Sequence, residues 1–183
     1  MIQQVTSSGI TGWQAPDARS FSWMDARNLA RSAHTGQTDL TGRDYFTGHL
    51  DPIAASIHRY GDRAIAAAWL HDIIEDTRHW PTPITVIQLH AWGVPAIVIE
   101  AVDAVTRRPD ETYKELITRA CAHPLGCIVK LADNWYNIIS NPGLAQVDRQ
   151  KAESMLRTRY IPARDRLIAA RTRYETDGIL PAL

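Results

Sequence analysis

Helix boundary signals divide this chain, from about residue 21 onward, into segments of helical length. Ser22 with Asp25 resembles a capping box, Asp51-Pro52 provides an N-cap and a proline at the first helical position, and Gly61 follows as a stop. Asn141-Pro142-Gly143 is expected to end a later helix. The segments predicted to be helical are residues 22–34, 51–60, 62–76, 83–92, 95–105, 110–122, 125–140 and 144–174.

Strand signals are weak by comparison. Short β-branched runs lie inside segments of about ten residues that proline and glycine enclose, and this length favours a helix. The 183 residues fit a single domain. We therefore expect an all-α, single-domain helical bundle over residues 21–183. Residues 1–20 are rich in Ser, Thr, Gly and Gln without periodicity, which predicts a flexible N-terminal arm.

The charge balance limits the classes of partner. The chain holds 20 Lys and Arg against 20 Asp and Glu, so it lacks the basic excess with which a general nucleic-acid binder displaces phosphate counterions. Its first residues do not form a signal peptide, and its apolar runs are shorter than the roughly 18–20 residues that span a bilayer. We expect a cytoplasmic protein without membrane contact, and the sequence leaves oligomerisation open.

One mostly apolar segment, AAAWLHDIIEDT at residues 66–77, includes four ionisable residues: His71, Asp72, Glu75 and Asp76. Carboxylates this close together repel one another, and a divalent cation would reverse that cost. Imidazole and carboxylate groups are suitable ligands for Mn, Fe or Zn. The alternative is an exposed helix end whose acids are solvated.

A metal bound there needs ligands from other parts of the chain. His49 lies at the end of a polar loop, directly before Asp51-Pro52, and Asp133 lies in the middle of an apolar helix, where an unpaired charge is costly. Each alone is open to another reading, as a helix-end histidine or a salt-bridged aspartate. Together with His71 and Asp72 they complete a set of two histidines and two aspartates.

Four motifs in this order are similar to those of the HD superfamily of metal-dependent phosphohydrolases. They are TGH at 47–49, LHDIIEDT at 70–77, VTRR at 105–108 and VKLADNWYN at 129–137. Within that superfamily the chain most resembles the hydrolase domains of RelA/SpoT proteins and the small alarmone hydrolases, over about residues 24–167. The resemblance implies an HD-type helical fold.

The resemblance also implies a role for each matched residue. The metal ligands would be His49, His71, Asp72 and Asp133, with Mn2+ the usual ion, although another divalent transition metal fits the same ligands. Glu75 and Asp76 match the pair that orients or deprotonates water and assists the leaving group. The matched supporting residues are Asn137 at the ribose, Ser140 near the substrate, and His34 behind the site.

Substrate recognition is where the chain departs from the family pattern. Alarmone hydrolases carry an Arg-Lys pair before the first ligand histidine, whereas residues 37–44 here hold a single basic residue, Arg43, and two acids. The basic residues that we expect to contact substrate phosphates are Arg43, Lys130, Arg107 and Arg108. The basic C-terminal helix is open to the same role or to that of a solvated face. The expected partner is a small phosphorylated nucleotide.

The leading hypothesis is an HD-domain, Mn2+-dependent guanosine 3′,5′-bis(diphosphate) 3′-pyrophosphohydrolase. One alternative is an HD-type nucleotidase or phosphodiesterase with another nucleotide substrate. Another is a non-catalytic, nucleotide-sensing or antitoxin-like module that keeps the fold.

Overall fold

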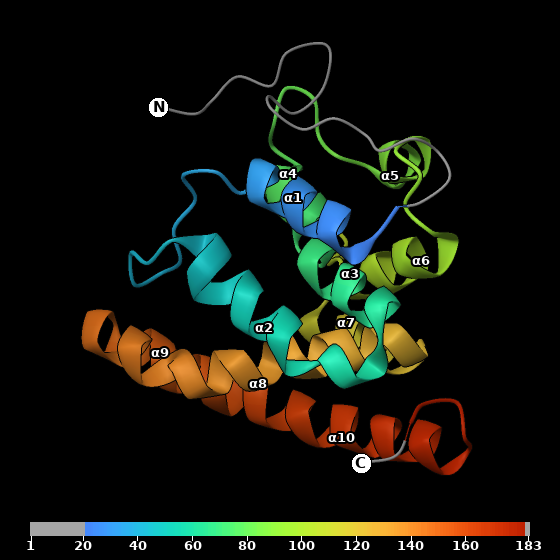
Figure 1. Ribbon diagram of the computed structural model, residues 1–183. Helices are drawn as coiled ribbons and strands as arrows, with labels where there is room; N and C mark the ends of the chain where they lie inside the picture. Colours follow the sequence, from blue (N-terminus) through green and yellow to red (C-terminus); the bar gives the residue numbers. More distant parts are fainter. Residues whose placement is uncertain (1–20, 182–183) are drawn as a thin grey trace.

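The computed structural model describes residues 21–181, so the expected N-terminal arm lies outside the described residues. Within this range the regular elements are helices, which confirms the all-α prediction, and an isolated bridge joins Thr38 to Asp44. No described helix is both long and apolar enough to cross a membrane. The helices of Figure 1 are α1 (Trp23–Ala33), α2 (Asp51–Ser56), α3 (Asp62–Leu70), α4 (Ile73–Thr77), α5 (Val86–Ala91), α6 (Ala96–Val105), α7 (Tyr113–Cys121), α8 (Pro124–Val147), α9 (Arg149–Met155) and α10 (Ile161–Thr176).

Three short helical segments of other types complete the chain. Two are π-helices, η1 (Phe46–Leu50) and η3 (Leu156–Tyr160), and one is a 3-10 helix, η2 (His58–Tyr60). The segment η1 leads directly into α2, and η3 leads directly into α10. Single π-helical turns inside longer helices often occur at functional sites, because the wider turn redirects the side chains that it carries.

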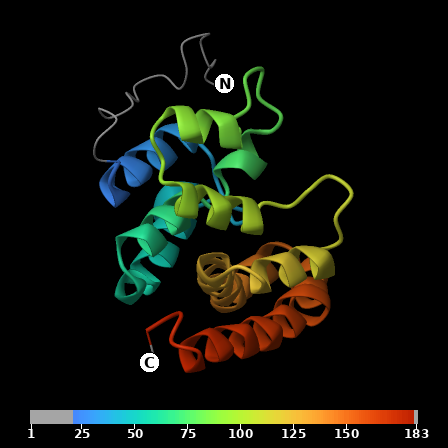
Figure 2. The ribbon, with the colours of Figure 1, turned by 90° about the vertical axis from the view of Figure 1, so that its right-hand side faces the viewer.

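The helix α3 lies at the centre of the bundle. It packs against α1, α2, α6 and α8, and four of its residues, Ala64, Ala66, Ala67 and Ala68, are buried alanines. Small side chains let neighbouring helices approach closely. Figures 1 and 2 show α8 and α10 side by side along one edge of the molecule, with α1, α3 and α4 on the other side.

The contact between α6 and α8 is also close. Gly126, in the first turn of α8, faces Ala104 in α6, and a Cβ atom added to Gly126 would lie 2.9 Å from the Cβ of Ala104. Real Cβ atoms do not approach one another this closely, so glycine is required here by space. This contact places α8, which carries Asp133, at a fixed distance from the N-terminal half of the bundle.

The prediction that Asn141-Pro142-Gly143 ends a helix is wrong, because α8 continues to Val147. Pro142 lacks the N–H that would bond to the preceding turn, a loss that usually ends a helix. Packing offsets that loss. Asn141 is buried and donates through Nδ2 to the carbonyl of Ala152 in α9 at 3.1 Å, and Leu144 is also buried.

Several predicted helix starts also differ from the structure. Asp51 does not cap a helix, because η1 already precedes it and its own backbone is helical. The start of α7 is set by Thr112 and Glu115, which form a capping box, rather than by Asp110. A capping box at Thr85 starts α5 at Val86 instead of 83, and the predicted start at 144 falls inside α8, with α9 beginning after Asp148. The start of α1 follows the predicted signal, since Ser22 and Asp25 form its capping box.

Candidate metal centre

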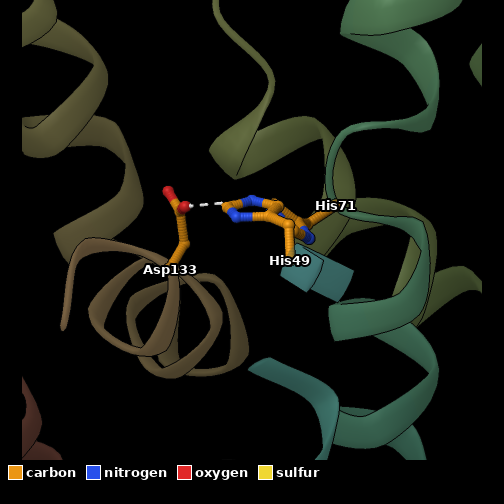
Figure 3. Close-up of side chains that lie close together, drawn as sticks. All are labelled: His49, His71 and Asp133. Carbon is orange, nitrogen blue, oxygen red and sulfur yellow. Dashed lines mark ion pairs between the residues drawn. The ribbon is translucent and has the colours of Figure 1, made fainter. Parts of the chain in front are cut away.

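The four predicted metal ligands come from three separate parts of the fold. His49 belongs to η1, Asp133 lies in the middle of α8, and His71 and Asp72 occupy a short interruption between α3 and α4. A continuous helix through residues 62–76 was predicted, so this interruption is a correction. Figure 3 shows the two imidazole rings side by side, with the Asp133 carboxylate facing them from α8.

The ligand atoms of His49, His71 and Asp133 all lie within 4.8 Å of one another, and the three residues are buried. His49 Nε2 is 3.5 Å from Asp133 Oδ1 and 3.4 Å from Asp72 Oδ2. Asp72 Oδ2 lies 2.9 Å from His71 Nε2. Two nitrogens and two carboxylates therefore converge on one small volume, an arrangement that could hold a divalent metal ion.

The chemistry of His71 fits a metal ligand. Its Nδ1 lies 2.8 Å from the carbonyl oxygen of Ala68, to which Nδ1–H donates a hydrogen bond. This bond fixes Nδ1 as a donor, so Nε2, which lies 2.9 Å from Asp72 Oδ2, is the nitrogen that a metal ion would bind in place of a proton. A histidine ligand is typically held in this way, with one nitrogen on a backbone carbonyl and the other directed at the metal.

The charged groups of the cluster shift one another's pKa values. Burial lowers the pKa of His71, but the negative charges of Asp72 and Asp133 outweigh burial and raise it to about 9. Burial raises the pKa of Asp133, but the Lys130 ammonium group, 2.7 Å away, and the two histidines lower it below its ordinary value. Tyr45 donates its hydroxyl to Asp72 Oδ2 at 2.5 Å and so fixes that carboxylate.

Glu75 and Asp76 are each held by a segment distant in sequence. Glu75 Oε2 accepts a hydrogen bond from the backbone N–H of Arg107 at 2.9 Å. Asp76 Oδ2 accepts one from Nε2 of Gln37 at 2.7 Å. Burial and the Asp72 carboxylate raise the pKa of Asp76 to about 7, against the effect of the Gln37 hydrogen bond. A carboxyl group with a pKa near neutrality is suited to general acid or base chemistry.

His34 lies behind this pair, as the sequence predicts. Because the side-chain nitrogen of Gln37 donates to Asp76, the side-chain oxygen of Gln37 faces His34 and accepts from Nδ1–H at 2.7 Å. Burial lowers the pKa of His34 and so favours the neutral ring, while the Gln37 oxygen favours the tautomer with the proton on Nδ1. His34, Gln37 and Asp76 therefore form a short hydrogen-bonded chain that ends at the candidate site.

The cluster opens into a pocket of about 490 Å³. A volume of this size is within the range of roughly 300–1,000 Å³ for small-molecule sites. The predicted substrate residues Asn137, Ser140, Lys130 and Arg43 line the pocket, as do the predicted catalytic residues Glu75 and Asp76.

Three of the predicted substrate residues have protein partners. Asn137 donates to Asp133 Oδ1 at 2.6 Å, and Lys130 pairs with the other oxygen of that carboxylate. Arg43 binds Asp39 through Nε and Nη2, at 2.9 and 2.8 Å. Asn137 and Lys130 thus orient the Asp133 carboxylate, and the charge of Arg43 is balanced within its own loop.

A comparison with curated proteins finds similarity to a hydrolase. The chain is 30% identical over 153 residues to the guanosine-3′,5′-bis(diphosphate) 3′-pyrophosphohydrolase of Haemophilus influenzae. The match covers 76% of this chain, and the chain spans about a fifth (21%) of the length of that relative. No family model matches the chain. The similarity supports a distant relationship to HD-type hydrolases.

Some pocket residues carry no motif that sequence reasoning could detect. Tyr45, which fixes Asp72, lies in a segment predicted to be an irregular loop, and that prediction is wrong from Phe46 onward because η1 begins there. Arg159 and Tyr160 reach the pocket from η3, in a basic C-terminal stretch for which phosphate contact and a solvated face were both open from the sequence. Their positions depend on how the C-terminal helices fold back over α8.

Proposed function

We propose that this chain is a divalent-metal-dependent phosphohydrolase that acts on a phosphorylated nucleotide. Its specific substrate in this proposal is guanosine 3′,5′-bis(diphosphate), and the proposed reaction removes the 3′-diphosphate. The observation that carries the proposal is the convergence of His49, His71 and Asp133 beside a substrate-sized pocket. The similarity to a hydrolase of this nucleotide supports it.

The proposed ligands are His49, His71, Asp72 and Asp133, and Mn2+ is the proposed ion. When bound, a divalent cation supplies Lewis acidity, which makes a water molecule more acidic and stabilises charge on phosphoryl oxygens. The mixed nitrogen and oxygen set suits this role, since closed structural sites are usually built from thiolates and histidines. Lys130 and Asn137 hold the Asp133 carboxylate in place for coordination.

Asp76 is the proposed general base. Its Oδ2 is occupied by Gln37, and Oδ1 has no hydrogen-bond partner among the described residues, so Oδ1 is available to accept a proton from the attacking water. The water oxygen adds to phosphorus as the bond to the ribose 3′ oxygen breaks, which yields guanosine 5′-diphosphate and pyrophosphate. The leaving 3′ oxygen takes up one proton to become a hydroxyl, and Glu75 is proposed to relay it. Asn137 and Ser140 are proposed to contact the nucleoside.

A specific observation favours a second candidate, hydrolysis of another nucleotide. The side chain of Arg43 is bound to Asp39, so the loop before His49 does not present a free cation to guanine or phosphate. A nucleotide panel in the presence of Mn2+ separates the two candidates. Pyrophosphate release from guanosine 3′,5′-bis(diphosphate) alone supports the first, and turnover of another nucleotide instead supports the second.

The same assay tests whether the chain is an enzyme. Asp72→Ala should lose both bound metal and turnover, while Asp165→Ala, which alters an exposed acid in α10, should keep both. Metal content is measured by elemental analysis of the purified proteins. Full metal content in Asp72→Ala contradicts the proposed site. Nucleotide binding by a wild-type protein that turns over no nucleotide supports a non-catalytic sensor instead.

A further inference from the structure

Two arginines at the pocket lack acidic partners. Four basic residues line the pocket, and two of them are neutralised, Arg43 by Asp39 and Lys130 by Asp133. Within residues 21–181, no carboxylate forms an ion pair with Arg107 or Arg159. Both therefore present an uncompensated positive charge to the same pocket that holds the carboxylate-rich metal centre.

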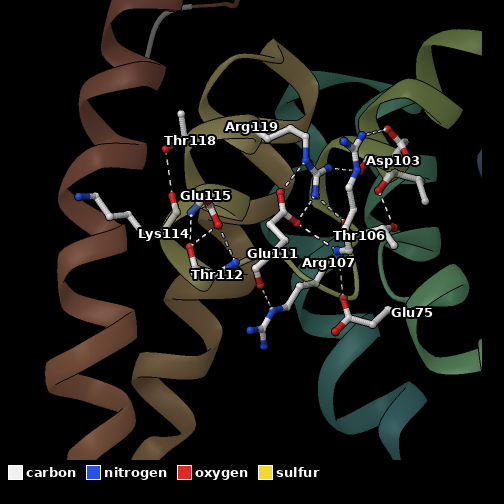
Figure 4. A network of polar contacts seen from close by, with 12 residues as sticks. Glu75, Asp103, Thr106, Arg107, Glu111, Thr112, Lys114, Glu115, Thr118 and Arg119 are labelled. Carbon is white, nitrogen blue, oxygen red and sulfur yellow. Dashed lines mark hydrogen bonds and ion pairs between the residues drawn. The ribbon is translucent and has the colours of Figure 1, made fainter.

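Arg107 is rigidly placed. Its backbone N–H donates to Glu75, its carbonyl oxygen accepts from Arg78 Nη2 at 2.5 Å, and its Nε donates to the carbonyl oxygen of Glu111 at 3.0 Å. These bonds leave both terminal nitrogens of its guanidinium group without a partner among the described residues. Figure 4 shows this group extending away from Glu75 and from Arg119.

Arg159 is placed by a turn that is itself anchored. It lies in η3, and the carbonyl oxygen of the next residue, Tyr160, accepts a hydrogen bond from Nδ2 of the fully buried Asn134 at 3.1 Å. The guanidinium carbon of Arg159 is 5.8 Å from the ring centroid of Tyr113, which also lines the pocket. Stacking over an aromatic ring restrains the group and leaves its N–H donors available at its edge.

We infer that Arg107 and Arg159 bind a second phosphate group of the substrate, separate from the group that reacts at the metal centre. This inference rests on the proposed function. Two unpaired guanidinium groups match the planar, bidentate geometry with which arginine holds phosphate oxygens. Recognition of the distal phosphates thus belongs to the α6–α7 loop and to η3, in place of the loop that contains Arg43.

The closing experiment measures binding separately from turnover. Dissociation constants are determined by equilibrium dialysis with metal removed by a chelator, for guanosine 3′,5′-bis(diphosphate) and for guanosine. Arg107→Gln and Arg159→Gln should each weaken binding of the bis(diphosphate) about tenfold and leave guanosine binding unchanged, because guanosine has no phosphate. Each change of tenfold corresponds to the loss of one charge-assisted contact.

The chain offers a matched control for each variant. Arg108 is next to Arg107 but faces Asp103 outside the pocket, and Arg157 is exposed in η3 two residues before Arg159. Arg108→Gln and Arg157→Gln remove the same net charge as the pocket variants. Because neither residue lines the pocket, both control variants should bind the bis(diphosphate) as the wild type does. Because Arg159 is exposed, its replacement should not affect folding, which circular dichroism would verify.

The outcomes separate this inference from the proposed function. A KM that rises about tenfold in Arg159→Gln, with kcat within about twofold, supports the second phosphate site. The inference is overturned if Arg107→Gln and Arg159→Gln both bind the bis(diphosphate) as tightly as the wild type. It is also overturned if the pocket variants and the controls lose affinity equally, or if the wild-type protein does not bind the bis(diphosphate). Arginine-dependent binding without any Mn2+-dependent turnover would contradict the proposed function and leave the phosphate site in place.

Discussion

Gln37 and Asp76 are joined by a hydrogen bond of 2.7 Å across 39 positions of the sequence, from the side-chain amide to Oδ2. The bond fixes the proposed base from outside the helix that carries it. Because His34 holds the other end of the Gln37 amide, the orientation of that amide is also set. Gln37 is thus a positioning residue for Asp76.

Replacing Gln37 with leucine should slow the proposed reaction and leave substrate binding nearly unchanged. We expect kcat to fall about 10–100-fold, as is usual when a residue that orients a metal-site group is removed. The hydrogen bond lowers the pKa of Asp76, so its loss should move the acidic limb of the kcat–pH profile to higher pH. Gln146→Leu, at an exposed position of α8, is the control. A wild-type profile in Gln37→Leu would exclude the positioning role.

Metal binding should stabilise the whole bundle, since the proposed ligands belong to η1, the α3–α4 junction and α8. An ion present at a hundred times its dissociation constant adds about 2.7 kcal/mol to the free energy of unfolding. For a chain of this size that corresponds to a rise in Tm of roughly 5–10 °C. Differential scanning calorimetry with Mn2+ and then with excess chelator measures the rise and its reversal.

Replacing each of two histidines separately shows whether the ion binds at the proposed site. His49→Ala should abolish the Mn2+-dependent rise in Tm, because it removes a ligand whose atoms meet those of His71 and Asp133. His58→Ala, at an exposed position, should keep it. An equal rise in both variants would show that the ion binds elsewhere.

Glu111 and Arg119 connect the loop after α6 to α7. Arg119 donates to Glu111 through Nε at 2.9 Å and Nη2 at 2.6 Å, and also to the carbonyl oxygen of Thr106 at 2.7 Å. We expect Glu111→Gln to reduce the free energy of unfolding by about 1.5–3 kcal/mol at pH 7, the usual range for hydrogen bonds to charged groups. Urea denaturation measures this change.

The effect of Glu111→Gln should depend on pH. The hydrogen bonds from Arg119 hold the pKa of Glu111 below its ordinary value, so its contribution is complete above its ordinary pKa and is lost as the pH falls through the lowered pKa. The difference in stability between the two proteins should therefore shrink as the solution is acidified below the ordinary pKa of a glutamate. The control is Glu153→Gln, in an exposed pair with Arg149, and a constant difference at all pH values would contradict the assigned cause.

Two glycines of α8 should respond in opposite directions to alanine. Gly126→Ala places a methyl group against Ala104 at 2.9 Å, and we expect it to destabilise the protein by about 1–3 kcal/mol, as overpacking does. At Gly143 the added Cβ would lie 3.7 Å from Thr41, an ordinary contact. Gly143→Ala should stabilise the helix by about 0.5–1 kcal/mol. Equal shifts in the urea midpoints of the two variants would contradict this packing.

The helical class was predictable because its signals are local. A capping box such as Ser22 with Asp25 acts within four residues, and the structure contains it. The continuation of α8 through Pro142 was not predictable in this way. It depends on the hydrogen bond from Asn141 to Ala152 and on the burial of Leu144, which exist only after the chain has folded back on itself.

In the candidate site, too, some features follow from local sequence patterns and others depend on tertiary packing. His49, His71 and Asp133 stand in sequence patterns that predicted a common site, and the structure brings their ligand atoms together. The assignment of roles to these residues stays a prediction. Arg107 stands in the VTRR motif, but the motif does not show that its backbone amide holds Glu75, because that contact depends on tertiary packing.

The interruption between α3 and α4 has a consequence for the dipeptide that occupies it. Neighbouring residues on an α-helix project about 100° apart, so their side chains diverge unless they turn back toward one another. His71 Nε2 and Asp72 Oδ2 nevertheless meet at 2.9 Å. Both residues keep backbone angles in the right-handed helical region, so the chain runs on in nearly the same direction through the interruption. A sequence optimised for an unbroken helix from Asp62 to Thr77 would favour dispersal of the pair.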